Sequence, residues 1–179
     1  MNKKWLSFAH PKLNAAMISW LGIIMALQLI LSKISFGPQF LKISPAFVMT
    51  ALLGYYFGPW WAGLAGIFTD ILGHTILGGG GEFFLGFTFS AFVAPFLYGM
   101  VLHNHRATLQ RTLLATTLVT LINNIFLNTL WVVMLYHLNV KVILPIRIGK
   151  NIISWIIETI ILFVVLRFIE QRHLQFKHK

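Results

Sequence analysis

The sequence contains no cysteine, and only 4 of its 179 residues are acidic. The absence of cysteine excludes disulfide bonds, thiolate metal ligands and cysteine nucleophiles. Charged residues of both signs make up 10% of the chain, against roughly 25% in a soluble domain. The sequence also lacks a Gly-x-x-x-x-Gly-Lys-Ser/Thr nucleotide loop and a His-Glu-x-x-His metal motif. We therefore expect neither a cofactor nor a metal, and no room for a soluble catalytic domain.

Apolar residues make up 58% of the chain and predict an integral membrane protein. A helix needs about 20 mainly apolar residues to span a bilayer, so the chain holds five or six spans with short connections. We predict one all-α transmembrane domain, residues 1–179, with short tails at about 1–12 and 170–179. The Gly58-Pro59 step splits one apolar stretch into a helical hairpin, and Pro145 falls in the first turn of the last helix. The six predicted spans are roughly 13–32, 44–57, 60–77, 83–102, 109–137 and 144–169.

The net charge of +10 reflects membrane topology rather than nucleic-acid binding, because Lys and Arg lie largely in tails and loops. The apolar stretch after Lys4 has no small-residue cleavage site, so we expect a mature helix rather than a signal peptide. The cation bias predicts that both termini of this multi-pass membrane protein are cytoplasmic. With six spans, the cytoplasmic side carries nine cations, Lys3, Lys4, Lys12, Arg106, Arg111, Arg167, Arg172, Lys177 and Lys179, and the other side carries five, Lys33, Lys42, Lys141, Arg147 and Lys150.

Five charged or amide residues interrupt the apolar spans: Asp70, Asn124, Asn128, Arg147 and Lys150. Ionisable groups at membrane depth cost roughly 2.5–3.5 kcal/mol each on insertion scales, so they usually serve a binding site or a translocation path. The predicted topology places these residues at similar depth on three helices. A cavity open to the outside, with amides at its base and cations at its mouth, would suit a flat, hydrogen-bonding, negatively charged molecule. Helical spacing adds His74, Thr117, Thr120, Trp131, Asn151, Ser154 and Glu158 to the same polar faces.

Other interpretations of these residues stay open at this stage. The polar groups can satisfy one another between helices, with Asp70 neutralising Arg147 or Lys150. Asp70 and His74 can also be read as the base and orienter of an intramembrane enzyme, although no plausible nucleophile accompanies them. A purely structural membrane subunit is a third possibility, which the concentration of polar groups in the outer half disfavours.

Two further features lie outside the polar set. The loop around Phe36, Gly37 and Pro38 and the glycine run Gly78, Gly79, Gly80 and Gly81 are either flexible gates at the mouth of the cavity or ordinary turns. The first span carries a stripe of small residues, Ala15, Ser19, Gly22 and Ala26, which lets another helix approach closely. That helix belongs either to this chain or to another subunit.

Several motifs resemble the substrate-binding S component of energy-coupling factor (ECF) vitamin transporters, most closely the folate-specific branch. The resemblance covers nearly the whole chain and is most specific in two stretches, Gly86-Phe87-Thr88-Phe89-Ser90 and Leu127-Asn128-Thr129-Leu130-Trp131. The remaining motifs recur in S components for several vitamins: the small-xxx-small first span ending in Leu29-Ile-Leu-Ser-Lys33, the hairpin from Leu53-Gly54 to Phe57-Gly58-Pro59, and Thr69-Asp70-Ile71-Leu72-Gly73.

The resemblance implies a six-helix protein of the bacterial plasma membrane that captures folate outside. It also implies docking through the Gly22-x-x-x-Ala26 face on a transmembrane coupling subunit with two cytoplasmic ATPases, and delivery by toppling of the whole S component. In this interpretation Asp70, Asn124 and Asn128 bind the pterin, Phe87 and Trp131 form flat walls, and cations bind the glutamate tail. An S component for pantothenate or a thiamine precursor is the nearest alternative. The full predicted substrate-binding set is Asp70, His74, Phe87, Thr88, Asn124, Asn128, Trp131, Arg147, Lys150 and Lys33.

Overall fold

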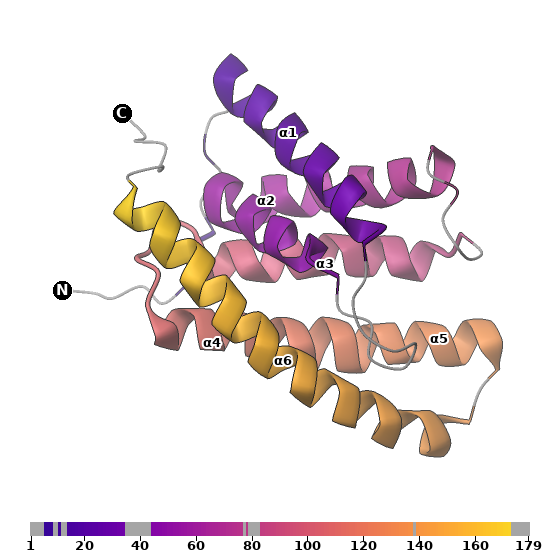
Figure 1. Cartoon of the computed structure of the whole chain (residues 1–179). Coiled ribbons are helices and arrows are strands. Elements are labelled where there is room, and N and C mark those ends of the chain that lie inside the picture. Colours follow the sequence, from indigo (N-terminus) through magenta and orange to yellow (C-terminus); the bar gives the residue numbers. More distant parts are fainter. Residues whose placement is uncertain are drawn as a thin grey trace.

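The computed structural model describes residues 6–8, 11, 14–34, 44–76, 78, 83–137 and 139–172, and every regular element in this part of the chain is a helix. The segments α4, η1 and α5 follow one another without a break and form one long helix (Figure 1). The elements are α1 (Ala15–Ser32), α2 (Ala46–Thr75), α3 (Leu85–Leu102), α4 (Leu109–Leu118), the π-helix η1 (Val119–Leu127), α5 (Asn128–Tyr136) and α6 (Val140–Gln171).

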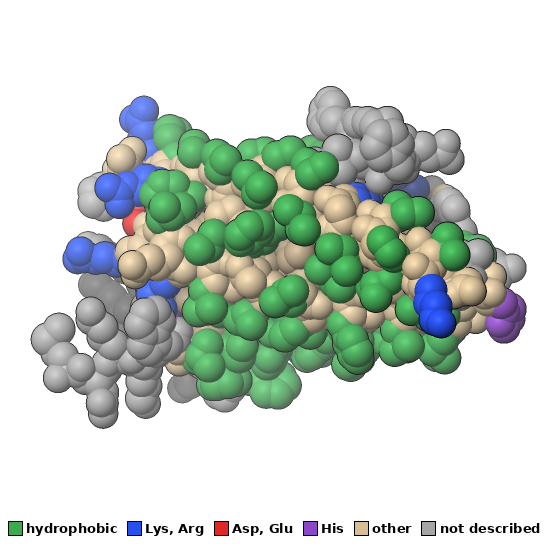
Figure 2. Space-filling model, turned by 90° about the horizontal axis from the view of Figure 1, so that it is seen from below, with side chains coloured by type: hydrophobic (Ala, Val, Ile, Leu, Met, Phe, Trp, Pro, Cys, Tyr) green, Lys and Arg blue, Asp and Glu red, His purple; other side chains and the backbone are tan. Residues whose placement is uncertain are grey.

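Among the described residues, four helices are long and apolar enough to cross a membrane: α1, α3, the continuous α4–η1–α5 helix and α6. The surface agrees with this assignment, because hydrophobic side chains cover the middle of the face seen in Figure 2, while most of its Lys and Arg side chains gather at one end. The all-α membrane class predicted from the sequence is therefore confirmed. The predicted count of six spans is not confirmed, because α2 is a single 30-residue element that contains a break.

The break in α2 lies at Gly58, where the sequence predicted a hairpin. Gly58 has φ 75° and ψ 176°, a backbone conformation that side-chain-bearing residues rarely adopt. Pro59 follows it and has no N–H to continue the helical hydrogen bonds. The chain changes direction at this step (Figure 1), so the parts of α2 before and after Gly58 run along different paths.

The start of α6 differs from the prediction. The helix begins at Val140, four residues before the predicted start at 144, because the Asn139 side chain accepts a 3.0 Å hydrogen bond from the backbone N–H of Lys141 and caps it. Pro145 consequently lies in the second turn rather than in the first, and the sequence interpretation of Pro145 as a first-turn residue is wrong. The capping signal at Asn139 decides where the helix starts, and the proline is accommodated inside it.

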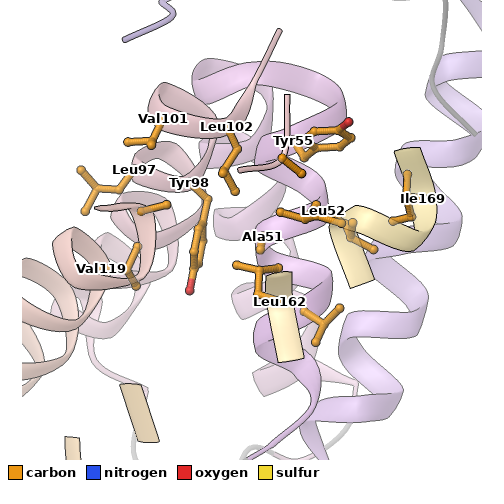
Figure 3. Packing of buried hydrophobic residues seen from close by; sticks show 14 residues of the cluster. Ala51, Leu52, Tyr55, Leu97, Tyr98, Val101, Leu102, Val119, Leu162 and Ile169 are labelled. Carbon is orange, nitrogen blue, oxygen red and sulfur yellow. The ribbon is translucent and has the colours of Figure 1, made fainter. Parts of the chain in front are cut away.

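The core of the molecule is built on close contact between α2 and α3. A Cβ atom added at Gly54 would lie 2.4 Å from the backbone nitrogen of Gly99, and one added at Gly66 would lie 2.0 Å from the carbonyl oxygen of Ala91. Small residues let two helix backbones approach this closely, and in lipid such packing drives helix association. Figure 3 shows the buried cluster that surrounds one end of this contact, to which α6 contributes Leu162.

Helix α1 is attached to this core through one narrow face. Met17 and Ile24, two turns apart, are its buried hydrophobic residues and join a cluster with Leu53 and Phe57 of α2. The Gln28 side chain adds a 3.0 Å hydrogen bond to Thr50. The other faces of α1 are left open by the described part of the chain, and this exposure bears on the function proposed below.

Candidate functional site

A cavity of about 390 Å³ lies between α3, η1, α5 and α6, and we call it the α3–α6 cavity. Helix α3 contributes the ring of Phe87, η1 contributes Asn124, and α5 contributes its first residue, Asn128. Five residues of α6 complete the lining: Arg147, Lys150, Asn151, Ser154 and Glu158. These five recur at helical spacing, so they form one polar stripe along an otherwise apolar helix.

The π-helix η1 sets the orientation of the two amides. Its closing hydrogen bond runs from the backbone N–H of Asn128 to the carbonyl of Asn123, an i to i+5 connection. Segments of this kind are uncommon and are frequently found at functional sites. Buried Asn123 donates a 3.3 Å hydrogen bond to the side-chain oxygen of Asn124 and holds that amide in place. The wider turn brings Asn124 and Asn128 to the same cavity from two adjoining segments.

The charges along the α3–α6 cavity are separated by sign. Arg147 and Lys150 lie near the start of α6, and both are half-buried. The Arg147 guanidinium donates to the hydroxyl of Thr129 on α5 at 3.4 Å. Glu158 lies 11 residues further along, a rise of about 16 Å at 1.5 Å per residue. The cavity is therefore cationic at one end and carries a carboxyl group toward the other.

A second cavity of about 300 Å³ is lined by α1, α2 and Ala91 of α3, one turn after Phe87, and we call it the α1–α2 cavity. Asp70 lines it and accepts a 2.7 Å hydrogen bond from the hydroxyl of Thr88. His74, one turn further along α2, has its Nε2 atom 3.9 Å from the other carboxylate oxygen of Asp70. The His74 ring also packs edge-on against Phe83. The remaining lining residues are Gln28, Leu29, Ser32, Lys33, Ala46, Gly66, Thr69, Gly73 and Ala91.

The structure divides the predicted substrate-binding residues between these two cavities, whereas the sequence analysis expected one. Phe87, Asn124, Asn128, Arg147 and Lys150 come together in the α3–α6 cavity. Asp70, His74 and Lys33 line the α1–α2 cavity, with Thr88 bonded to Asp70 at its wall. Adjacent residues of α3, Phe87 and Thr88, thus serve different cavities.

Trp131 is not among the lining residues of either cavity, although its ring packs on Phe84, which packs in turn on Phe87. Its ring packs on the backbone of Gly86, where an added Cβ would lie 2.6 Å from the indole, and its N–H donates to Ser90 at 3.0 Å. The sequence analysis placed Trp131 in one stripe with Asn124 because regular α-helical spacing was assumed. The intervening π-helix changes that spacing.

Sequence reasoning missed several residues of the α1–α2 cavity, of which Gln28 is the clearest. Gln28 is an amide in the middle of the apolar α1, the same signal that identified Asn124 and Asn128. The sequence analysis noted Asn151, Ser154 and Glu158 on the polar face of α6 but left them out of the predicted binding set. The structure places all three in the α3–α6 cavity.

Residues 17–166 match the family of the ECF transporter substrate-specific component. The chain belongs to this family. It is similar to the folate transporter FolT of Leuconostoc mesenteroides subsp. mesenteroides, with 37% identity over 73% of this chain and 71% of the relative. It is also similar to FolT of Clostridium novyi, with 30% identity over 85% of this chain and 88% of the relative. A crystal structure of FolT bound with folic acid superposes with a TM-score of 0.78 at 33% identity, over 86% of this chain and 94% of that one. The resemblance to the folate-specific branch is confirmed.

The small-residue stripe of this S component faces away from the rest of the chain. Ala15, Ser19, Gly22 and Ala26 are all exposed, and a Cβ atom added at Gly22 would meet no described atom within 4 Å. The stripe therefore does not serve packing within the described part of the S component. This resolves the alternative left open by the sequence against an internal partner among the described helices.

The predicted gating segments of the S component lie largely outside the described residues. Of the seven residues named from the sequence, Gly78 is described, and its φ of 55° is in the left-handed region that favours glycine. Phe36, Gly37, Pro38, Gly79, Gly80 and Gly81 lie outside the described residues. Among the described residues, no group of three or more His, Cys, Asp or Glu side chains is placed to hold a metal ion.

Proposed function

We propose that this S component binds folate in the α3–α6 cavity as the substrate-capturing subunit of an ECF importer in the bacterial plasma membrane. The observation that carries the proposal is the lining of that cavity, which combines three amides, one aromatic ring and two cations within an apolar bundle. The similarity to folate transporters and to a folic acid complex supports folate over pantothenate or a thiamine precursor. Family membership likewise supports transport over an intramembrane enzyme.

The chemistry of folate matches the lining group by group. A pterin ring presents adjacent donors and acceptors, and an amide such as Asn124 or Asn128 can both donate and accept. The face of the ring can stack on Phe87. The glutamate tail carries carboxylates, which form strong charge-assisted hydrogen bonds with Arg147 and Lys150. Because water is largely excluded at membrane depth, each of these contacts counts for more than it would at an aqueous surface.

We propose a different role for Asp70 and Thr88 from the direct pterin contact expected from the sequence. One carboxylate oxygen of Asp70 already accepts from Thr88, and the other lies near His74. The bond to Thr88 links Asp70 to α3 at the residue next to Phe87. Asp70 is thus a positioning residue for the wall of the folate cavity. Lys33 and His74 line the neighbouring cavity and are proposed to contact the ligand tail where it leaves the α3–α6 cavity.

Titration of the purified protein with folic acid tests the binding site. Arg147→Gln removes a charged donor worth about 1.5–3 kcal/mol, so the dissociation constant rises roughly ten- to a hundredfold. Arg172→Gln is the matched control, since Arg172 is an exposed cation at the end of α6 and leaves the affinity unchanged. Equal affinity of the wild type and Arg147→Gln would contradict the site, and binding of pantothenate or a thiamine precursor in place of folate would contradict the substrate.

We also propose that the α1 stripe docks on the transmembrane coupling subunit, which carries two cytoplasmic ATPases, and that the S component topples in the membrane to release folate inward. This chain has no nucleotide loop of its own, so ATP-driven uptake requires such partners. Gly22→Leu should abolish co-purification with the coupling module and leave folate binding intact. Gly149→Leu is the control, because Gly149 is also an open glycine but lies on α6. Retained co-purification of Gly22→Leu would place the docking face elsewhere.

The proposed topology has both termini in the cytoplasm and the cationic end of the α3–α6 cavity toward the outside. Because the chain has no cysteine, single introduced cysteines report on sidedness without background. In intact cells, a membrane-impermeant maleimide should label Lys141→Cys at the start of α6 and spare Gln110→Cys at the start of α4. The opposite pattern would invert the topology.

A further inference from the structure

Glu158 is the one residue of the α3–α6 cavity whose charge opposes the others. It projects from the same polar stripe of α6 as Ser154, one turn earlier, and Asn151. Within the described residues, Glu158 forms no hydrogen bond and no ion pair. The cation nearest to it along the stripe, Lys150, lies eight residues away, a rise of about 12 Å. The carboxyl group lines the cavity within electrostatic reach of Lys150 and Tyr98, but no described side chain donates a hydrogen bond to it.

A carboxylate at membrane depth without hydrogen-bond donors is costly, and such groups persist where they serve a substrate or an ion pathway. The cost is removed when hydrogen-bond donors reach the carboxylate oxygens. No donor of the described lining is bonded to Glu158, although Ser154 and Asn151 share its cavity. The occupant of the cavity is consequently the natural source of those donors.

We infer that Glu158 is a specificity-determining residue that binds paired N–H donors on the ring of the ligand. The inference rests on the proposed function and adds an orientation to it. A carboxylate accepts two parallel hydrogen bonds, which matches the adjacent 2-amino and ring N–H groups of a pterin ring. The rise of about 16 Å between Glu158 and Arg147 separates the ring-binding end from the carboxylate-binding end. The reverse orientation brings the glutamate tail of the ligand against Glu158, where like charges repel.

Folic acid and its 2-desamino analogue, titrated into the wild type and Glu158→Gln, test the inference. A glutamine offers one acceptor and one donor group. One of the two paired hydrogen bonds is therefore lost, and the amide NH₂ of glutamine faces an N–H donor of the ligand. Folic acid should bind about tenfold or more weakly to Glu158→Gln. The 2-desamino analogue should bind weakly to the wild type and lose little further affinity on the substitution. The two changes are then non-additive, as expected for groups in contact.

Pteroic acid, which lacks the glutamate tail, provides the matched control. Its affinity should fall on Glu158→Gln as that of folic acid does, and should be insensitive to Arg147→Gln. Equal losses for folic acid and the 2-desamino analogue, or no loss for either, would overturn the inference while the proposed function stands. Failure of the wild type to bind folic acid would overturn both. If Glu158→Gln does not fold, Glu158→Asp and the discrimination of the wild type between the two ligands provide the same readout.

Discussion

The Thr88 hydroxyl donates a 2.7 Å hydrogen bond to the carboxylate of Asp70, which lines the α1–α2 cavity, and connects α3 to α2. Thr88 is buried, and Asp70 is 19% exposed at its side chain, so the bond is largely shielded from solvent. The neighbour of Thr88 on α3 is Phe87, the aromatic wall of the α3–α6 cavity. The hydrogen bond between Thr88 and Asp70 therefore helps to position the part of α3 that carries the aromatic wall of the α3–α6 cavity.

Thr88→Val should destabilise the protein through this tie. Valine has nearly the shape of threonine but cannot donate, so the Asp70 carboxylate loses its partner at a cost of about 1–3 kcal/mol. The melting temperature in detergent should fall accordingly. Thr75→Val is the control, because the Thr75 hydroxyl is exposed and donates to carbonyls of its own helix. Equal melting temperatures for Thr88→Val and the wild type would show that the bond contributes nothing.

Glycines packed between α2 and α3 should tolerate substitution by alanine far less well than a glycine with no neighbouring atoms. A Cβ atom at Gly54 would lie 2.4 Å from a backbone nitrogen of α3, which cannot move aside, so Gly54→Ala forces the helices apart. Overpacking of this kind costs about 1–3 kcal/mol. Gly149→Ala meets no neighbouring atom and gains up to about 1 kcal/mol from helix propensity. The two melting temperatures should therefore shift in opposite directions, and a similar shift for both would contradict the packing shown.

The sequence was sufficient for the all-α membrane class, because length and hydropathy largely determine which segments can cross a bilayer, but the predicted count of six spans is not confirmed. It was also sufficient for the break at Gly58, since glycine followed by proline has few helical alternatives. It was not sufficient for the start of α6, where Asn139, six residues before Pro145, caps the helix. Both Pro145 and Asn139 are signals for a helix start, and the helix begins at the residue after Asn139, whose side chain makes the capping hydrogen bond.

The candidate site could be predicted residue by residue but not as one cavity. Polar residues in apolar spans identified the stripe of α6 and the amides of η1, because polar groups are energetically unfavourable in lipid and usually serve a function there. The division by α3 depends on which side of that helix each neighbour packs, and one helix cannot reveal this from its own sequence. The position of Trp131 depends on the π-helical turn of η1, which breaks the spacing that sequence arguments assume.

The contact between α4 and α6 provides a clean pairwise measurement. The hydroxyls of Thr116 and Thr159 lie 2.7 Å apart and are both buried. A double-mutant cycle with Thr116→Val and Thr159→Val should give a coupling energy of about 0.6 kcal/mol and no more than about 1.7, the range for hydrogen bonds between membrane helices. Thr117→Val with Thr159→Val is the control cycle, because Thr117 bonds Trp155 instead. Equal coupling in both cycles would contradict the pairing of Thr116 with Thr159.

Trp131 should act on stability rather than on folate affinity, in contrast to the role expected from the sequence. Its indole N–H donates to Ser90, which is 4% exposed, and its ring covers the backbone of Gly86. Trp131→Phe keeps an aromatic ring but loses that bond, which costs about 1 kcal/mol. Thermal unfolding should register the loss, while the dissociation constant for folic acid stays within about a factor of two of the wild type.

Ser90→Ala separates the two possible roles of Trp131. Removal of the hydroxyl leaves the indole N–H buried without its acceptor, so Ser90→Ala should destabilise the protein by about 1–3 kcal/mol. Adding Trp131→Phe to Ser90→Ala should then cost little more, because the donor that lacked an acceptor is gone. If Trp131 instead formed a wall of the folate site, Trp131→Phe would weaken folic acid binding strongly, and its effects would add to those of Ser90→Ala. Melting temperature and folic acid affinity, measured on the wild type, the two single variants and the double variant, distinguish a stabilising role of Trp131 from a role in the folate site.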